Sequence, residues 1–195
     1  MQLVFATANP NKVREVRELL SDTLYSIVSM HDLGVTEDIL ETEDTLAGNA
    51  LLKARYLYQH YGYDCFSEDT GLEIDALGGL PGVRTARFAG EQATTADNIR
   101  LTLEKMKGQS VRTARFRTVM ALILHGKEYL FHGTCEGIIE QTPSGSDGFG
   151  YDPIFRPEGF DRSFAEMSKA EKNTVSHRGR ALRQLIEFLT KRSGD

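Results

Sequence analysis

The chain has 195 residues, of which 40% are hydrophobic and 26% are charged. This length is enough for one domain with a substantial core, and we expect a single two-lobed domain over residues 1–195. The 28 acidic residues outnumber the 23 basic ones and give a net charge of -5, which argues against nucleic acid as a partner because a phosphate backbone requires a basic face. No apolar run approaches the length of a signal h-region or a membrane span, so we expect a cytoplasmic protein with no membrane partner.

The two cysteines, Cys65 and Cys135, lie in apolar runs that resemble strands. Their spacing matches neither a metal clip nor a disulfide framework. We therefore expect both to be reduced core residues.

The N-terminal residues predict a strand, a polar loop and a helix. Residues 3–6 form an apolar run, and from Val13 onward apolar residues recur at helical spacing. The loop at residues 7–12 precedes this helix, where unpaired N–H groups and a positive partial charge suit a phosphate, with Lys12 as a further cation. The alternative is that Asn9 and its neighbours only cap the helix, and the loop lacks the spacing of a Walker A motif.

The remaining regular elements are predicted from the periodicity of apolar residues. Helical spacing indicates helices over residues 46–57, 99–106 and 182–189. Alternating and then continuous apolar residues indicate strands over residues 112–124 and 128–139, joined by a hairpin turn. This mixture of strands and helices indicates the α/β class.

The stretch Ser67-Glu68-Asp69-Thr70-Gly71-Leu72 places two carboxylates directly after an apolar run. We expect a short buried strand that ends before them, so that they emerge at a strand end, where α/β sheets place ligand sites. Thr70-Gly71 predicts a turn directly after the carboxylates, and a second turn is predicted at residues 78–82, which contain three glycines. Together with Glu41, these carboxylates offer the oxygen ligands that Mg²⁺ prefers, although an acidic pair is more often a solvated face.

A long segment over residues 144–162 is rich in Gly, Ser, Asp and Pro but also contains aromatic residues, which argues against disorder. Its glycines would let the backbone approach a flat ligand while Phe149 stacks on it, and Asp152 could accept a hydrogen bond from that ligand. The alternative is an ordinary loop that its aromatic residues pin to the core.

Residues 169–180 concentrate cations before and at the start of the closing helix, and Ser168 with Glu171 predicts a capping box. Lys172 and Arg178 add hydrogen-bond donors in a chain with few basic clusters. His177 alone is more often structural than catalytic.

Several blocks in a fixed order span nearly the whole chain. They are Ala6-Thr7-Ala8-Asn9 with Lys12, Asn49-Ala50 with Lys53-Ala54, Glu68-Asp69-Thr70-Gly71-Leu72, Leu77-Gly78-Gly79-Leu80-Pro81-Gly82, Ala86-Arg87-Phe88, Gly148-Phe149-Gly150-Tyr151-Asp152-Pro153, and Lys172 with Ser176-His177-Arg178. Each block alone is weak, whereas their joint order is specific. In this order they resemble the inosine triphosphate pyrophosphatase family.

The resemblance implies an elongated mixed central sheet flanked by helices, with a substrate cleft between two lobes, and a homodimer. It also implies a Mg²⁺-dependent enzyme that hydrolyses the non-standard purine nucleoside triphosphates ITP, dITP and XTP to the monophosphate and pyrophosphate, which cleanses the nucleotide pool. ATP should be a poor substrate, because a donor such as Arg178 would bond the oxygen at C6 of hypoxanthine or xanthine but not the amino group of adenine.

The resemblance further implies roles for individual residues. Asp69 matches the general base, and Glu41 and Asp69 match the metal ligands. The residues matched to substrate binding are Thr7, Ala8, Asn9, Pro10, Asn11, Lys12, Lys53, Thr70, Phe149, Gly150, Tyr151, Asp152, Lys172, His177 and Arg178.

Three departures from the family pattern bear on these roles. Glu68 stands where many relatives have an aspartate. Leu40-Glu41-Thr42-Glu43 and Gly48 stand where many have a Glu-Glu-Thr-Gly run and a glutamate before Asn49, which leaves the metal ligand beside Asp69 open among Glu41, Glu43 and Glu68. Asp147 also places a negative charge where a glycine is common.

Two other functions remain open from the sequence. One is a pyrophosphatase for modified pyrimidine nucleotides, of the kind that Maf-like proteins resemble. The other is a regulator that binds a purine nucleotide without cleaving it, although carboxylates beside a triphosphate make sense mainly with a catalytic metal.

Overall fold

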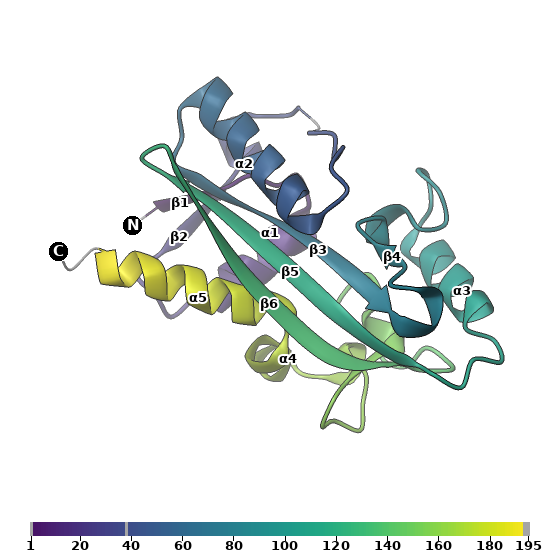
Figure 1. The fold of residues 1–195 in the computed structure, drawn as a ribbon. Coiled ribbons are helices and arrows are strands. Elements are labelled where there is room, and N and C mark those ends of the chain that lie inside the picture. The colour runs from purple at the N-terminus through teal and green to yellow at the C-terminus, as the bar shows by residue number, and fades with distance from the viewer. Residues whose placement is uncertain (1, 38, 193–195) are drawn as a thin grey trace. The chain divides into compact units, whose positions relative to one another are not determined.

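The computed structural model describes residues 2–37 and 39–192 (Figure 1). The strands are β1 (Gln2–Phe5), β2 (Ser26–Ser29), β3 (Cys65–Ile74), β4 (Pro81–Gly82), β5 (Thr113–Leu124), β6 (Lys127–Ile139) and β7 (Phe155–Pro157). The helices are α1 (Pro10–Leu19), α2 (Leu46–Tyr61), α3 (Thr95–Lys105), α4 (Lys169–Val175) and α5 (His177–Arg192).

These strands form one mixed sheet. Their order is β2-β1-β3-β5-β6-β7, and β4 pairs with β3. β1 lies parallel to both β2 and β3, whereas β4 and β7 are antiparallel to their partners. The predicted α/β class, with a mixed sheet flanked by helices, is confirmed.

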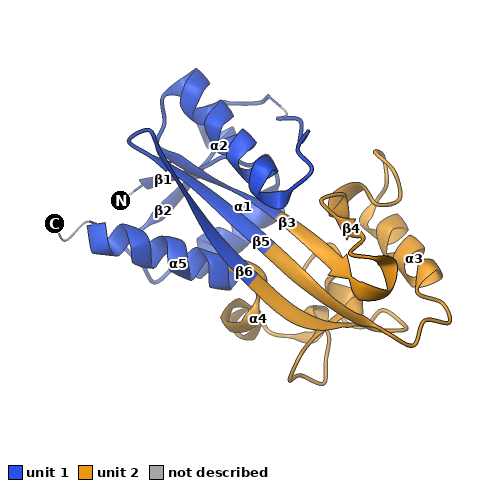
Figure 2. Ribbon diagram, viewed as in Figure 1, with its two compact units in different colours: residues 1–69, 118–133, 179–195 blue, residues 70–117, 134–178 orange. Residues whose placement is uncertain are grey.

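The chain divides into two compact units (Figure 2). Unit 1 consists of residues 1–69, 118–133 and 179–195, and unit 2 of residues 70–117 and 134–178. Each unit has its own hydrophobic core: that of unit 1 gathers side chains from β1, α1, β3 and α5, and that of unit 2 gathers side chains from β3, β5, β6 and the residues before α4. The passage from unit 1 to unit 2 occurs inside β3, after Asp69.

β3 corrects the prediction for the acidic stretch. It runs unbroken from Cys65 to Ile74, so Glu68 and Asp69 lie inside a strand rather than beyond its end, and Thr70-Gly71 is not a turn. The prediction was wrong because carboxylates interrupt the apolar run by which a buried strand is recognised. The predictions also lacked β2, whose four residues are too few to show a period.

Other predictions for local structure are confirmed. Gly78, Gly79 and Gly82 have positive φ angles in the predicted turn. Cys65 and Cys135 are free and buried. Residues 144–162 are ordered and include β7. Within the described ranges, no helix has both the length and the apolar character needed to cross a bilayer.

Candidate active site

In unit 1, α2 packs closely against the first half of β3. The buried face of α2 carries two alanines, Ala50 and Ala54, whose small side chains allow the helix backbone to approach the strand. Their carbonyl oxygens accept hydrogen bonds from the hydroxyl of Ser67 and the thiol of Cys65, respectively. Because side chains alternate along a strand, Asp69 lies on the same face of β3 as these two residues.

Asp69 is held among charged and polar side chains of this face. The Nζ atom of Lys53 lies 2.5 Å from Glu41 Oε1 and 3.5 Å from Asp69 Oδ1, so one ammonium group serves two carboxylates. The side-chain amide of Asn49 donates to Asp69 Oδ2 at 3.3 Å. Burial raises the pKa of the Asp69 carboxyl above its usual range, and the negative charge of Glu41 adds to this rise while Lys53 opposes it.

Glu68 lies on the opposite face of β3. Its neighbour Phe66 belongs to the core that α1 and α5 share, and stacks on Phe5 with ring centroids 4.4 Å apart. On this face Glu68, which is fully buried, meets the Nζ atom of Lys12 at 3.3 Å. The two acidic residues that are adjacent in sequence therefore meet different lysines.

The acidic residues of unit 1 include a pair suited to Mg²⁺. Among the residues described, no group of three or more His, Cys, Asp or Glu side chains is arranged to hold a metal ion. Mg²⁺ does not require one, because it commonly takes one or two protein carboxylates and completes its shell with water and substrate phosphates. Glu41 and Asp69, which already share the cation of Lys53, fit that donor set.

The loop at residues 7–12 caps α1. The side chain of Asn9 accepts hydrogen bonds from the backbone N–H groups of Asn11 and Lys12, and Pro10 occupies the start of the helix, where its missing N–H costs nothing. Thr7 Oγ1 in turn accepts from the N–H of Asn9 at 3.2 Å. The capping interpretation is confirmed, and phosphate binding by this loop stays a prediction.

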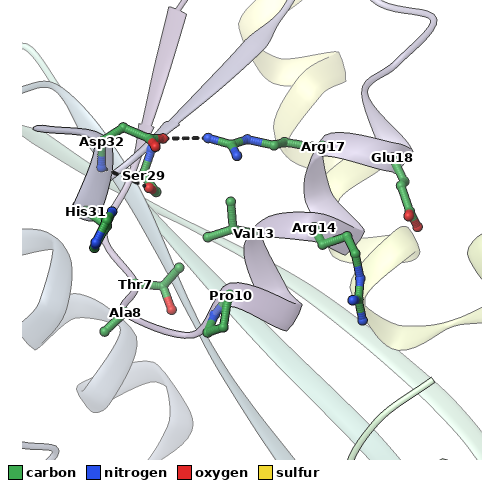
Figure 3. Close-up of a pocket in the computed structure, with 10 residues that line it drawn as sticks. All are labelled: Thr7, Ala8, Pro10, Val13, Arg14, Arg17, Glu18, Ser29, His31 and Asp32. Atoms are coloured by element: carbon green, nitrogen blue, oxygen red, sulfur yellow. Dashed lines mark hydrogen bonds and ion pairs between the residues drawn. The ribbon is translucent and has the colours of Figure 1, made fainter.

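A pocket of about 520 Å³ adjoins this loop within unit 1. Figure 3 shows Thr7, Ala8 and Pro10 on one side of it and the ion pair of Arg17 with Asp32 on another. The remaining wall residues are Val13, Arg14, Glu18, Ser29 and His31. Charges of both signs line the pocket, so it offers no surface of a single charge beside the loop.

In unit 2, Asp152 organises the loop that contains Phe149. Asp152 Oδ2 accepts a hydrogen bond from the N–H of Phe149 at 2.8 Å and lies 2.7 Å from Lys172 Nζ. Gly148 has a φ of +78°, and a Cβ atom there would lie 2.1 Å from Asp152 Oδ2, so this close approach requires glycine. Asp152 is 3% exposed, and its carboxylate positions the loop and the lysine.

Cations lie over the ring of Phe149. Lys172 Nζ is 5.3 Å and Arg178 Cζ is 5.4 Å from the ring centroid, both within the range of a cation–π interaction. His177 stacks on Phe116 with centroids 4.6 Å apart and is buried. Unit 2 therefore brings Phe149, Asp152, Lys172 and Arg178 together, with His177 packed into the core beside them.

Three further residues that the resemblance matched to substrate lie in unit 2. The side chain of Tyr151 belongs to the core and its hydroxyl donates to the Thr85 carbonyl at 2.8 Å. Burial raises the pKa of this hydroxyl. Thr70 is half-buried on β3, and Gly150 has a positive φ angle.

Sequence reasoning missed one contact of this site. Asn49 was recognised only as part of a family motif, yet it bonds Asp69. The signal was present, because Asn49 and Lys53 are four residues apart and must share one face of a helix.

The sequence of this chain is similar to sequences of known proteins over nearly its whole length. The chain is 51% identical over 190 residues to a protein of Flavobacterium johnsoniae named dITP/XTP pyrophosphatase, with 97% of this chain and 98% of the relative covered. It is 52% identical over 191 residues to a protein of the same name from Christiangramia forsetii, with 98% and 100% covered.

Solved structures agree with these relatives. A HAM1 protein from Coxiella burnetii superimposes with a TM-score of 0.89 at 39% identity, covering 98% of this chain and 99% of that one. The Ham1 protein of Staphylococcus aureus gives a TM-score of 0.87 at 33% identity, with 98% and 100% covered. The Ham1 family model matches residues 3–188, so the resemblance drawn from the ordered motifs is confirmed and the chain belongs to the Ham1 family.

Proposed function

We propose that this protein hydrolyses the non-standard purine nucleoside triphosphates dITP, XTP and ITP to their monophosphates and pyrophosphate, which removes them from the nucleotide pool. The observation that carries the proposal is the group formed by Glu41, Lys53 and Asp69. It occurs in a chain that is about half identical to relatives named dITP/XTP pyrophosphatase.

We propose Mg²⁺ as the cofactor, held by Glu41 and Asp69. Bound there, the ion would neutralise charge on the phosphates and lower the pKa of a bound water. The pairing of both carboxylates with the ammonium group of Lys53 supports this assignment. Glu68 is less suited, since it lies on the other face of β3 and pairs with Lys12.

The residues of unit 1 would bind the triphosphate and prepare the water. Lys12 and Lys53 supply positive charge for the phosphates, and the loop at residues 7–12 supplies the N-terminus of α1. Asp69 would orient the attacking water and accept its proton.

The residues of unit 2 would bind the purine. Phe149 offers a ring for stacking, and Lys172 and Arg178 supply donors beside that ring. Hypoxanthine and xanthine present an oxygen at C6 that accepts such a hydrogen bond, whereas the amino group of adenine does not. Asp152 would keep the loop and Lys172 in place.

The test is a panel of nucleoside triphosphates with and without Mg²⁺, in which the products are identified. We expect pyrophosphate and monophosphate from dITP, XTP and ITP, little product from ATP, and none without a divalent ion. Release of inorganic phosphate instead of pyrophosphate, or preference for a modified pyrimidine nucleotide, would contradict the proposal. Tight binding of a purine nucleotide without cleavage would favour a regulator.

We also propose that the protein works as a homodimer in the cytoplasm. The family resemblance supports the dimer, and the two free cysteines agree with a reducing compartment. Sedimentation equilibrium at micromolar concentration should give twice the mass of the chain. A monomer under these conditions would contradict the dimer, and fractionation of cells would test the compartment.

A further inference from the structure

Asn49 makes three hydrogen bonds from a fully buried side chain in the first turn of α2. Its Oδ1 atom accepts from the backbone N–H of Glu43 at 2.9 Å. Its Nδ2 atom donates to the carbonyl of Glu43 at 3.2 Å and to Asp69 Oδ2 at 3.3 Å. The pairing with both backbone groups of Glu43 fixes which end of the amide is oxygen and which is nitrogen.

This arrangement connects two parts of the candidate site. The amide is planar, so when one N–H and the oxygen are engaged by Glu43, the direction of the second N–H toward Asp69 is set. Glu41 precedes Glu43 by two residues, and Lys53 lies one helical turn after Asn49. The segment also packs tightly on α2, since a Cβ atom at Gly48 would lie 2.7 Å from the Cβ atom of Glu43.

The two oxygens of Asp69 consequently have different neighbours. Oδ2 receives the N–H of Asn49, and Oδ1 faces Lys53, which also contacts Glu41. A carboxylate held at one oxygen keeps a single orientation, which leaves the other oxygen directed to the shared cation.

We propose that Asn49 is a positioning residue for the reaction: its amide orients the Asp69 carboxylate and ties the segment that carries Glu41 to α2. The proposal rests on the proposed function of the same site. It assigns Asn49 no contact with substrate, so its loss should lower turnover more than substrate affinity.

Asn98 provides a matched control in unit 2. It is also a buried asparagine in the first turns of a helix, α3, and it also bonds a preceding segment through both ends of its amide. Its Oδ1 atom accepts from the N–H of Ala89 at 2.8 Å, and its Nδ2 atom donates to the carbonyl of Ala86 at 3.0 Å. Neither of these contacts involves a carboxylate. Asn98 therefore represents a buried asparagine whose hydrogen bonds are purely structural.

The experiment compares Asn49→Leu with Asn98→Leu, because leucine has a similar size and cannot hydrogen-bond. Both variants should lose stability in urea unfolding, since each loses the hydrogen bonds that a buried side chain makes to the backbone. With dITP and saturating Mg²⁺, kcat of Asn49→Leu should fall by about 10- to 100-fold, with KM changed by less than about threefold. kcat of Asn98→Leu should stay within about threefold of wild type, because Asn98 bonds only the backbone of Ala86 and Ala89 in these contacts.

A second variant separates the bond to Asp69 from the clamp on Glu43. When ionised, Asn49→Asp retains an acceptor for the N–H of Glu43, has no donor for Asp69 or for the carbonyl of Glu43, and adds a negative charge beside Asp69. Hydrogen exchange of the Glu43 amide should therefore stay slow in Asn49→Asp and become fast in Asn49→Leu, while kcat falls in both. This exchange measurement does not depend on turnover. If Asn49→Leu does not fold, the comparison of Asn49→Asp with wild type still tests the proposal.

The outcomes are distinguishable. If wild type cleaves dITP but kcat of both Asn49 variants stays within about threefold of Asn98→Leu, the positioning role is wrong and the proposed function stands. A loss that appears in KM alone would also overturn it. If wild type releases no pyrophosphate from any nucleotide, the proposed function and the inference that rests on it both fail.

Discussion

Unit 1 and unit 2 differ in the charge of the candidate functional residues that each contains. In unit 1, the two ammonium groups of Lys12 and Lys53 meet three carboxylates, those of Glu41, Glu68 and Asp69. When all are ionised, these five side chains carry an excess of negative charge. Such an excess of negative charge suits a divalent cation.

In unit 2, cations outnumber carboxylates among the corresponding residues. Lys172 and Arg178 lie over the ring of Phe149, and the carboxylate beside them is that of Asp152. Donors beside an aromatic ring suit a flat ligand that carries oxygen acceptors. The comparison teaches that the two units differ in chemistry: unit 1 gathers carboxylates around two lysines, and unit 2 gathers cations around an aromatic ring.

The largest expected effect comes from removing the proton acceptor of unit 1. Asp69→Asn should lower kcat for dITP by about 10²- to 10⁴-fold, the range for loss of a general base. The fold should be retained, because an asparagine oxygen can still accept the hydrogen bond from Asn49. Pyrophosphate release under saturating Mg²⁺ measures the effect, with Asp75→Asn, a change at an exposed ion pair with Arg115, as the control. A kcat near that of wild type would remove Asp69 from the chemistry.

The charge difference between the units can be tested by measuring the free energy of unfolding of a lysine variant in each unit. Lys53→Met should lower the free energy of unfolding by about 3 kcal/mol, the lower end for breaking a buried pair, because Glu41 stays partly exposed. Lys172→Met should also destabilise, since Asp152 loses its partner. Mg²⁺ should stabilise Lys53→Met more than wild type, and should stabilise Lys172→Met no more than wild type. Urea unfolding with and without Mg²⁺ makes the comparison, and equal recovery of the two variants would show that unit 1 has no preference for the cation.

A smaller effect is expected on base preference in unit 2. Arg178→Ala should lower the ratio of kcat/KM for ITP to that for ATP by about 10- to 100-fold, which corresponds to the loss of one hydrogen bond from a charged donor. Using a ratio cancels any general loss of stability. Arg162→Ala, which removes an exposed arginine paired with Glu171, serves as the control. An unchanged ratio would exclude Arg178 from recognition of the base.

The smallest effect concerns the two cysteines, one in each unit. Burial raises the pKa of the Cys65 thiol to about 12, so at pH 8 only about one thiol in 10⁴ is ionised, and alkylation should be slow and rise about tenfold per pH unit. Cys135 is buried as well. Mass spectrometry after alkylation would report which cysteine reacts first in dilute urea. Rapid labelling of Cys65 in the native protein would contradict the packing of α2 on β3.

Local sequence signals predicted much of this molecule correctly. Helical spacing located α1, α2, α3 and α5, because each buries one apolar stripe. Ser168 accepts from the N–H of Glu171 at the start of α4, which is one of the two hydrogen bonds of the predicted capping box. These features depend on residues within one or two turns, which is why the sequence alone reveals them.

Buried polar residues were the main source of error. The sequence predicted a strand that stops before Glu68, whereas β3 continues for several residues beyond it. A carboxylate inside a strand is stable only when a partner from elsewhere neutralises it, and Lys12 and Lys53 come from two helices that local patterns do not place on the strand. The role of Asn49 was missed for the same reason.

By itself, the sequence determined the α/β class, the helix caps and, through the order of its motifs, the family. Only the tertiary structure decided that Glu68 and Asp69, adjacent in the chain, belong to different environments. Successive side chains of a strand point to opposite faces, and the packing of α1 and α2 determines what each face meets. Glu68 meets Lys12, and Asp69 meets Asn49 and Lys53. Each of these contacts joins residues on different elements, so no local pattern in the sequence predicts it.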